Sequence, residues 1–564
     1  FEETKTTGFT NNFEVDWRVI DELRVRGRFG LTKSNEQMKK FRSPFNTEFN
    51  SQADIANKGS YEERNTQNLN YDGDFSLTYG KLFNEKHMVN VVGGMRLSQN
   101  GSNNSAYKVQ GFIDDEFSNP AFALGYQKDG NATYQDSKKR AVSYYLNFGY
   151  AYDDRYLLDV NYRSDGSSVF GSDRQFTNTW SVGLGWNIHK EAFFSDIEGI
   201  SLLKLRASIG NPGNQNFDDY ISTRIYSYNT DNMNIFGSSA IVSNLGNRNL
   251  EWQKTLDRNI GFDIIFLDNR LRVNFDYFNK RTDPLLVQIG TASSTGVKTL
   301  PRNVGKQITE GITLTMNYSI IRREDMFWSV NMNLRHQTSE YKEVSEVLTK
   351  YNLDNRNRNL TRYYDGGSPS DLWAVRSCGI DPATGREIFL DKNGEQTFVH
   401  NYDDEVVVGN SDPKVEGVIG TSFYYKGFSA SINLRYRLGG QIFMQTLYDK
   451  VENLSSSKKW ENLDKRALYD RWKQPGDQAK FKSIASSEVT PISSRFVEDN
   501  NVLSGESISL GYESTAPWLK HIGASSMSVR AYMNDIFRIS TVKNERGLSY
   551  PFARSVSFSL GVTF

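Results

Sequence analysis

The chain has 564 residues, and its 67 Lys and Arg balance 67 Asp and Glu, so the formal net charge is zero. This balance argues against a nucleic-acid binder, which needs surplus positive charge to displace phosphate counterions. Only 37% of the residues are hydrophobic while 13% are aromatic, so the apolar residues must follow a pattern that an average conceals.

Alternation of apolar with small or polar residues recurs from the N-terminal end onward, which is the period of a β-strand with two different faces. In segment 141–152, for example, Val142 and Leu146 alternate with Ser143 and Asn147. Each run is about ten residues long, which is enough to cross a bilayer as a tilted strand. The pattern predicts about seventeen strands, near 9–19, 22–33, 68–80, 84–97, 141–152, 155–165, 176–188, 202–211, 252–265, 270–282, 307–320, 326–337, 414–425, 427–438, 503–513, 523–534 and 553–564.

The connections alternate in length. Short charged turns, such as Asp21-Glu22 and Asp153-Asp154-Arg155, join the two strands of a hairpin. Short turns at one end and long loops at the other are typical of an outer-membrane β-barrel. A soluble β-sandwich or propeller also alternates, but its strands average ~5–6 residues. The long polar loops, which we expect to be extracellular, lie near 34–67, 98–140, 212–251, 338–413 and 439–502.

The strand count is odd, whereas single-chain bacterial barrels have an even number of strands. If 553–564 runs down to the periplasm, then 9–19 descends from the outside of the cell. We therefore expect residues 1–564 to be part of an all-β transmembrane antiparallel barrel that has lost its first strands, with about 22 strands when complete.

The first hairpin carries charges on one face of each strand. If the turn centres near Asp21, Asp16 faces Arg26 and Glu14 faces Arg28 across the ladder. A charge that faces lipid costs ~2–4 kcal/mol for Arg or Lys at the bilayer midplane, so these side chains are expected to face the lumen. They either contact a polar substrate or plug, or simply form internal ion pairs. The set comprises Glu14, Asp16, Arg18, Arg24, Arg26 and Arg28.

A family resemblance rests on ordered motifs along most of the chain. The segment Arg155-Tyr-Leu-Leu-Asp-Val-Asn-Tyr-Arg163-Ser-Asp-Gly resembles the barrel of the SusC/RagA family of TonB-dependent outer-membrane transporters, which is typical of Bacteroidetes. The segment Val502–Tyr512 departs from the family's usual basic pattern. Further matches are Leu203-Lys-Leu-Arg206, Asn249-Leu-Glu-Trp252, Asp276-Tyr-Phe-Asn-Lys280, Gly409-Asn-Ser-Asp-Pro413 and Tyr550-Pro-Phe-Ala-Arg554.

The resemblance implies an active importer of oligosaccharides or peptides, energised by TonB and capped by a SusD-like surface lipoprotein. A dimer of such pairs is an arrangement that the resemblance allows. It implies residence among the lipids of a Gram-negative outer membrane and a terminal aromatic, Phe564, that the barrel-insertion machinery reads. The family's N-terminal extension, TonB-binding segment and plug domain have no counterpart in the sequence. A passive porin, or a structural or receptor component of a larger outer-membrane complex, is the alternative.

Aromatic residues in the two longest loops are candidate contacts for substrate or for the lipoprotein, or they simply pack the loops. They are Tyr363, Tyr364, Trp373, Trp460 and Trp472. No catalytic or metal-binding set is found, because the five histidines form no HExxH motif. The single cysteine, Cys378, excludes a disulfide framework. The sequence therefore predicts a protein that is not an enzyme and needs no cofactor, rather than a soluble glycan-active enzyme.

Overall fold

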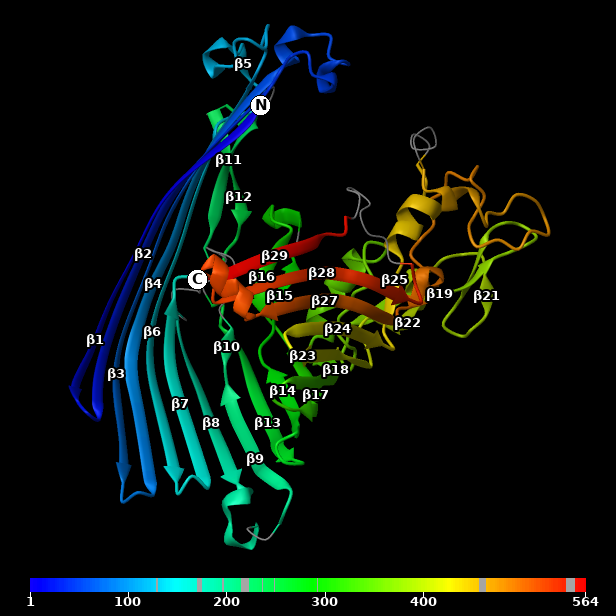
Figure 1. Ribbon diagram of the computed structural model, residues 1–564. Helices are drawn as coiled ribbons and strands as arrows, with labels where there is room; N and C mark the ends of the chain where they lie inside the picture. The colour runs from blue at the N-terminus through cyan, green and yellow to red at the C-terminus, as the bar shows by residue number, and fades with distance from the viewer. Residues whose placement is uncertain are drawn as a thin grey trace. The chain divides into compact units, whose positions relative to one another are not determined.

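A computed structural model describes most of the chain, which divides into two compact units (Figure 1). The first unit comprises residues 1–184, 209–256 and 284–303, and the second comprises 185–208, 257–283 and 304–564. The described residues are 1–127, 130–169, 175–194, 197–214, 223–235, 237–247, 249–291, 293–455, 463–543 and 553–564.

Antiparallel strands dominate both units. Among the described residues the main sheet has 17 long strands, which confirms the predicted all-β class and strand number. No helix in this described part is long and apolar enough to cross a membrane. The first unit holds β1 (Glu2–Ile20), β2 (Leu23–Arg42), β3 (Ser60–Phe83), β4 (His87–Gln110), β5 (Gly125–Tyr126), β6 (Thr133–Tyr152), β7 (Tyr156–Ser167), β10 (Gly213–Asn214), β11 (Ile225–Asn234), β12 (Gly237–Asn244), β15 (Leu286–Gly290) and β16 (Thr299–Asn303).

The second unit carries the remaining long strands and most of the helical turns. Three strands, β8 (Phe176–Asn187), β9 (Ile200–Asn211) and β13 (Gln253–Phe266), have residues in both units. The second unit holds β14 (Leu271–Thr282), β17 (Lys306–Arg322), β18 (Met326–Lys342), α1 (Ser345–Asp354), β19 (Asp371–Ile380), β20 (Glu387–Leu390), β21 (Gln396–Thr397), β22 (Glu405–Asn410), β23 (Val415–Tyr425), β24 (Phe428–Leu438), β25 (Gln441–Phe443), the π-helical turn η8 (Leu447–Glu452), β26 (Val497–Asp499), β27 (Val502–Ser514), β28 (Ser526–Ser540) and β29 (Val556–Thr563).

Short 3₁₀ turns complete the list of elements. In the first unit they are η1 (Thr47–Phe49), η2 (Ile55–Asn57), η3 (Pro120–Phe122) and η6 (Ser293–Thr295), and in the second η4 (Ile188–Lys190), η5 (Ala192–Phe194), η7 (Tyr402–Asp404), η10 (Lys465–Leu468), η11 (Ser494–Phe496) and η12 (Pro517–Ile522).

In the first unit β1, β2, β3, β4, β6 and β7 pair in that order as one antiparallel ladder. Because partners in a ladder share a face, the register sorts the side chains into two layers. One layer is apolar, with Phe13 opposite Phe29 and Leu97 opposite Val142. The other layer is polar, and its charge alternates from Glu14 to Arg96 in a row of directly opposed residues, namely Glu14, Arg28, Asp74, Arg96, Ser143 and Asp165.

The strands of the first unit extend further than the sequence pattern predicts. β2 pairs with β3 as far as Arg42 and Ser60, so the unpaired segment is 43–59 rather than 34–67. Likewise, β4 ends at Gln110 and β6 begins at Thr133, so the connection between them is 111–132, which contains the short β5, rather than the predicted loop 98–140. In the parts of these strands that lie beyond the predicted bounds, which we call their outer halves, both faces are polar, with Gln67 opposite Asn103. The alternation of hydrophobicity disappears there while the backbone ladder continues, because hydrogen bonding does not require an apolar face.

The two loops at that end of the first unit pack on each other. Phe41, Tyr61 and Phe112 form a buried cluster, and the backbone N–H groups of Gly111 and Phe112 both donate to the Lys58 carbonyl at 3.0 Å. At the other end the hairpin turns are tight, and Asp153 and Asp154 have positive φ angles of 51° and 52°. Asp tolerates this left-handed conformation better than most residues, which explains the charged turns.

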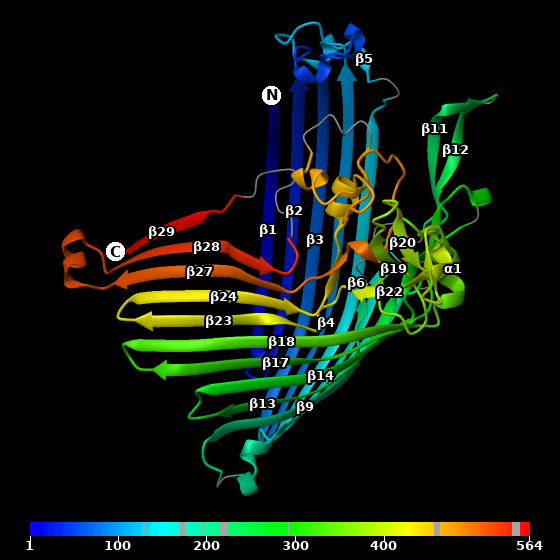
Figure 2. The same ribbon diagram turned by 90° about the vertical axis from the view of Figure 1, so that its right-hand side faces the viewer.

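In the second unit β14, β17, β18, β23, β24, β27, β28 and β29 pair in that order. Figure 2 shows these strands lying side by side, from green to red. The two longest connections, which follow β18 and β24, both leave from the same end of this ladder. The first of them contains the helix α1 and the small strands β19 to β22.

Candidate functional site

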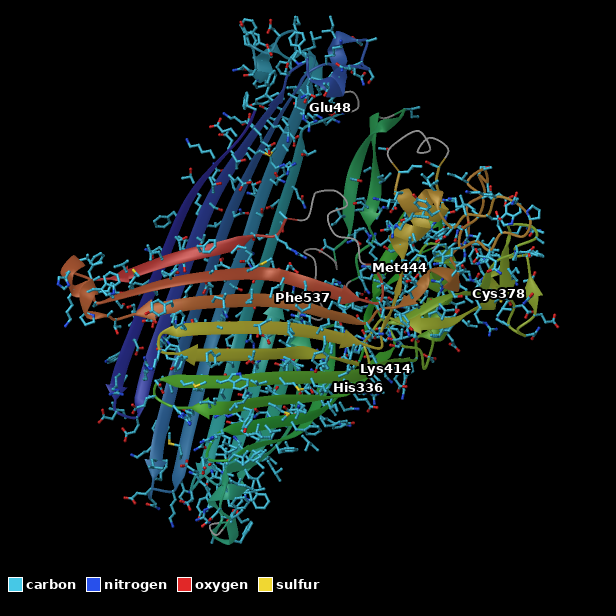
Figure 3. All side chains as sticks on the ribbon, turned by 45° about the vertical axis from the view of Figure 1, so that its right-hand side comes forward. Glu48, His336, Cys378, Lys414, Met444 and Phe537 are labelled. Carbon is cyan, nitrogen blue, oxygen red and sulfur yellow. The ribbon has the colours of Figure 1, made fainter. Side chains whose placement is uncertain are left out.

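The two long connections of the second unit fold together, and we call their described residues (343–413, 439–455 and 463–501) the loop assembly. It contains a four-stranded sheet in the order β21-β20-β19-β22 and the two-stranded sheet β25–β26. Figure 3 marks Cys378 and Met444 within it, and beside it His336, which lies inside β18, and Lys414, the residue before β23. There Nδ1 of His336 donates to the Lys414 carbonyl at 2.6 Å. The loops are therefore a folded structure.

A hydrophobic core joins the two connections. Phe496 is 1% exposed and makes an edge-on contact with Tyr448 at 5.4 Å between ring centroids. Burial raises the pKa of Tyr448 to about 12, and its hydroxyl donates to the Thr490 carbonyl at 2.9 Å. The core is formed by Ala374, Tyr448, Val451, Phe481, Ile492 and Phe496.

A buried charge network crosses the same boundary. Arg495 donates to Glu387 at 2.9 Å and to Glu452 at 2.7 Å, and the exposed side-chain fractions of the three are 10%, 6% and 0%. Ser493 donates to the second oxygen of Glu387 at 2.6 Å, and Thr490 donates to Glu452 at 2.9 Å. Each buried carboxylate thus has a cation and a hydroxyl donor, which is what makes burial of charge tolerable.

A second buried pair lies inside the first connection. Arg362 donates through Nη2 and Nε to the two carboxylate oxygens of Glu405, at 2.7 and 2.9 Å. Its Nη1 donates to the carbonyls of Asn359 and Thr361 at 2.9 and 2.8 Å. This fork geometry uses most of the guanidinium donors, so the pair fixes segment 359–362 against β22.

A cavity of about 310 Å³ opens beside the charge network. The residues that line it include Trp472, Phe398 and His400. Burial lowers the pKa of the His400 imidazole. The described residues contain no group of three His, Cys, Asp or Glu side chains able to hold a metal ion.

The structure separates the predicted contact aromatics into two places. Tyr363 packs on Tyr341 and Tyr351 at 5.2 and 5.1 Å, and Tyr364 lies 4.8 Å from Trp373. Burial raises the pKa of Tyr363, as expected for a packing residue. Trp472 lines the cavity instead, while Trp460 lies outside the described residues.

The predicted charges of the first hairpin lie on one face with the register that the turn position predicts, Glu14 opposite Arg28 and Asp16 opposite Arg26. The two shorter ion pairs are diagonal, Arg26 with Glu14 at 2.5 Å and Arg24 with Asp16, while the directly opposed Arg28 lies 3.8 Å from Glu14. Arg18 stands opposite Arg24. The paired side chains are 31–55% exposed, so solvent screens their attraction and each pair adds little to stability.

Two groups of residues at these sites were not predicted from the sequence. Asp74 and Arg96 extend the charged row of the first hairpin onto β3 and β4, and the alternation on those strands could have indicated them. Glu387 and His400 line the cavity, and Arg495 bridges Glu387 to Glu452 beside it. No spacing pattern links the three, since Glu387 and His400 belong to one connection and Arg495 to the other. Phe564, the predicted terminal aromatic, follows β29 directly and is 83% exposed.

Comparison with known proteins gives one family. Residues 2–454 match the family model described as TonB dependent receptor-like, beta-barrel. A TonB-dependent receptor of Formosa agariphila is 25% identical over 577 residues, covering 93% of this chain and 55% of the relative. The TonB-dependent receptor SusC of Bacteroides thetaiotaomicron is 24% identical, covering 100% and 56%. The chain spans a little over half the length, 53–60%, of the curated relatives that it matches.

Solved structures show the same fold. The structure of the RagAB peptide transporter superposes with a TM-score of 0.84 at 19% identity, covering 96% of this chain and 59% of that one. The RagAB peptide importer in its "closed-closed" state gives a TM-score of 0.82 at 18% identity with the same coverage. At this identity the likeness concerns the fold, which is that of a β-barrel.

Proposed function

Because the chain belongs to the TonB-dependent receptor family of β-barrels, we propose that it forms the wall and outer loops of an importer in a Gram-negative outer membrane. The resemblance to the SusC/RagA group is confirmed by SusC among the relatives and by the RagAB structures. The prediction that the chain is not an enzyme is confirmed as well, since this family consists of transporters.

The family match carries this proposal, and the two-faced strands support it. The apolar layer, represented by Phe29 and Leu97, faces lipid in the proposed arrangement. The charged layer, which contains Glu14, Asp16 and Arg28, faces a polar lumen. Charged side chains repeated on one face of a long strand are costly in lipid and are favourable toward water or protein.

We further propose that transport is energised by TonB and assisted by a SusD-like lipoprotein, with oligosaccharides or peptides as cargo. The folded loop assembly offers a rigid outer surface for such a partner. RagAB is described as a peptide transporter, so peptides stay among the candidate cargoes of this chain. Phe564 is proposed as the aromatic that the insertion machinery recognises.

Uptake in living cells tests the proposal. We expect cells with the full-length protein to deplete an oligosaccharide or peptide mixture, and we expect inactivation of TonB, or deletion of the copurifying lipoprotein, to stop the depletion. Unchanged uptake without TonB, together with a constitutively open channel in planar bilayers, would instead establish a passive porin.

A further inference from the structure

The ladder of the second unit also has an apolar layer, in which Met332 lies opposite Ile419. That layer contains a groove of about 520 Å³, a volume within the range of small-molecule pockets. Five neighbouring strands, β17, β18, β23, β24 and β27, contribute to its wall. Ile321, near the end of β17, and Met326, the first residue of β18, both line it. The groove therefore lies at the end of the ladder that carries the tight turns, away from the loop assembly.

Differences in side-chain size account for the groove. One row of directly opposed residues crosses four strands and consists of Trp328, Phe423, Ala430 and Leu510. Ala430 contributes a single methyl group between two large apolar side chains. Ile432, two residues further along β24, is large again on the same face, because side chains alternate along a strand. The apolar surface is therefore hollowed at Ala430, between Phe423 and Leu510.

The polar side-chain groups of the groove wall already have hydrogen-bond partners. Nε1 of Trp328 donates to Oγ1 of Thr421 at 2.9 Å, and this hydroxyl donates to the Ser329 carbonyl at 3.0 Å. Such partners are needed in an apolar environment, where an unsatisfied polar group costs free energy. With these bonds made, the wall presents mainly apolar surface, which suits a hydrocarbon chain better than a hydrogen-bonding ligand.

An aromatic row separates the groove from the turn between β23 and β24. Tyr425, Phe428 and Tyr512 are directly opposed, and the ring centroids of Phe428 and Tyr512 lie 4.4 Å apart. Tyr425 lies two residues after Phe423, so this row shares the face of the groove. Aromatic side chains are enriched where a barrel wall meets the membrane–water interface. The groove thus begins just inside such an interface.

A cation lies at the turn, on the side of the groove. The ammonium group of Lys426 lies over the ring of Tyr425, 5.3 Å from its centroid. No carboxylate in the described part of the chain pairs with this ammonium group. Glu513 follows Tyr512 directly and so falls on the opposite layer. The neighbouring turn, 322–325, carries two arginines and two carboxylates, so its charges cancel and the charge of Lys426 is in surplus.

We propose that the groove is a phospholipid site, which holds one acyl chain of a lipid of the periplasmic leaflet and its phosphate at Lys426. From the turn inward the surface presents a cation, an aromatic row and an apolar groove. A phospholipid has the same order of groups, namely phosphate, ester region and hydrocarbon chain, and a lysine binds phosphate as a point charge. The inference goes beyond the proposed import function. It takes from that proposal only that the apolar layer faces lipid and that the tight turns are periplasmic.

Fit and charge determine whether such a lipid is retained. Within a membrane the hydrophobic effect does not favour one apolar contact over another, because lipid chains are as apolar as the groove. Retention therefore depends on close packing of the chain at Ala430 and on the contact between the phosphate and Lys426. Each of these two contributions can be removed by one substitution.

The test is native mass spectrometry of the full-length protein, purified in detergent with its copurifying lipoprotein and freed of lipid by detergent exchange. It is titrated with palmitoyl-oleoyl-phosphatidylglycerol, or with palmitoyl-oleoyl-glycerol, which has the same chains and no phosphate. We expect the phosphatidylglycerol to bind more tightly than the diacylglycerol. Ala430→Phe, which fills the groove, should weaken phosphatidylglycerol binding by about tenfold or more. Lys426→Gln should weaken it by about fivefold and leave diacylglycerol binding unchanged.

Each variant has a matched control that should bind the lipid normally. Ala531→Phe adds the same ring to the same layer, because Ala531 lies opposite Leu510 and outside the lining of the groove. Lys86→Gln removes an exposed lysine from the turn between β3 and β4. Equal heat-modifiable mobility on gels shows that each variant is folded, and Lys426→Gln tests the site without a change in the membrane-facing wall.

Three results would each overturn the assignment: undiminished phosphatidylglycerol binding by Ala430→Phe, an equal loss in Ala531→Phe, or equal binding of the two lipids by the wild type. A wild-type dimer that Ala430→Phe separates, visible in the same spectra, would assign the groove to a second copy of this chain and overturn the lipid site as well.

Lipid binding and transport are measured separately, so the two proposals can fail separately. Uptake that does not depend on TonB, together with phosphatidylglycerol binding that Ala430→Phe weakens, would overturn the import function and leave the lipid site. TonB-dependent uptake, together with lipid binding that is insensitive to Ala430→Phe and Lys426→Gln, would overturn the lipid site and leave the import function.

Discussion

Two ion pairs of the second unit show how surroundings determine what a charge contributes. The side chains of Arg362 and Glu405 are 1% and 11% exposed, whereas those of Lys342 and Glu340, at the end of β18, are 50% and 43% exposed. Removing one partner of a buried pair leaves an unpaired charge in a poorly solvated site, whereas water replaces the lost partner of an exposed pair.

Arg362→Ala should therefore destabilise the loop assembly by about 3–5 kcal/mol, and the control Lys342→Ala by about 1 kcal/mol or less. The rate at which a protease cleaves within residues 343–413 of the intact protein measures the effect. Equal cleavage rates in the two variants would contradict a stabilising role for the buried pair.

His400 makes the loop assembly sensitive to acid. Burial lowers its pKa from 6.5, although Glu387, Glu405 and Asp404 act in the opposite direction. Below pH 6.5 the unfolded chain binds a proton that the folded state resists, so stability is complete above this value and falls as the pH drops toward the folded-state pKa.

We expect the protease cleavage rate of the loop assembly to rise as the pH falls below about 6.5, and the rise to be smaller in His400→Gln, which cannot titrate. Parallel pH profiles for the wild type and this variant would show that other groups cause the acid sensitivity.

At the scale of elements, a glycine in β4 makes room for an aromatic ring from β6. A Cβ on Gly94 would lie 2.5 Å from the Phe75 carbonyl oxygen and 2.6 Å from the hydroxyl of Tyr145. Tyr145 lies over this position and donates to Asp74 on β3 at 3.2 Å, so the ring links β6 to β3 across β4. Gly80 on β3, in contrast, has only Asn90 within 4 Å, at 3.8 Å.

Gly94→Ala should displace Tyr145 from Asp74 and destabilise the sheet by about 1–3 kcal/mol. Gly80→Ala should change stability by about 0.5 kcal/mol or less. The temperature at which the fast-migrating unboiled band disappears from a gel measures both. A Gly94→Ala protein that is as heat-resistant as Gly80→Ala would contradict the close packing.

The strands were predictable because each membrane-crossing segment repeats one rule, apolar then polar, over about ten residues. Segment 141–152 falls within β6 and ends on the same residue. The outer halves of β2 and β3 were not predictable, since polar residues on both faces are also what a loop contains. Within the loop assembly, strands such as β21 consist of two residues, too short for any periodicity to appear.

The residues of the candidate site likewise fall into those that local sequence predicts and those that only the tertiary fold brings together. Trp472 was predictable as a tryptophan in a polar loop. Its supporting residues, Gly385 and Pro382, belong to a turn on the other connection, and only the tertiary fold brings them together. The charged row beginning at Glu14 and Arg28 could be read from one hairpin, because two adjacent strands and a short turn fix their own register.

For the whole molecule, the assignment of one layer to lipid and the other to the lumen has a simple test on β6. Leu146 belongs to the apolar layer and is 49% exposed, while its neighbour Asn147 belongs to the opposite layer. Leu146→Arg should lower the free energy of folding into bilayers by about 2–4 kcal/mol, whereas Asn147→Arg should have a much smaller effect.

Folding into lipid vesicles at increasing urea concentration measures this difference. Equal effects of the two arginines would contradict the assignment of the layers, and a larger effect of Asn147→Arg would reverse it.

The bridge through Arg495 also bears on how this surface can diversify. Glu387 belongs to one connection, and Glu452 and Arg495 to the other, so replacement of residues 343–413 alone by an unrelated loop would deprive Arg495 of one of its two carboxylates. A graft of residues 439–501 alone would strand Glu387 without its cation. The two connections therefore have to be exchanged together by recombination if the buried charges are to stay paired. Exchange of one connection alone requires a second change that supplies the missing charge.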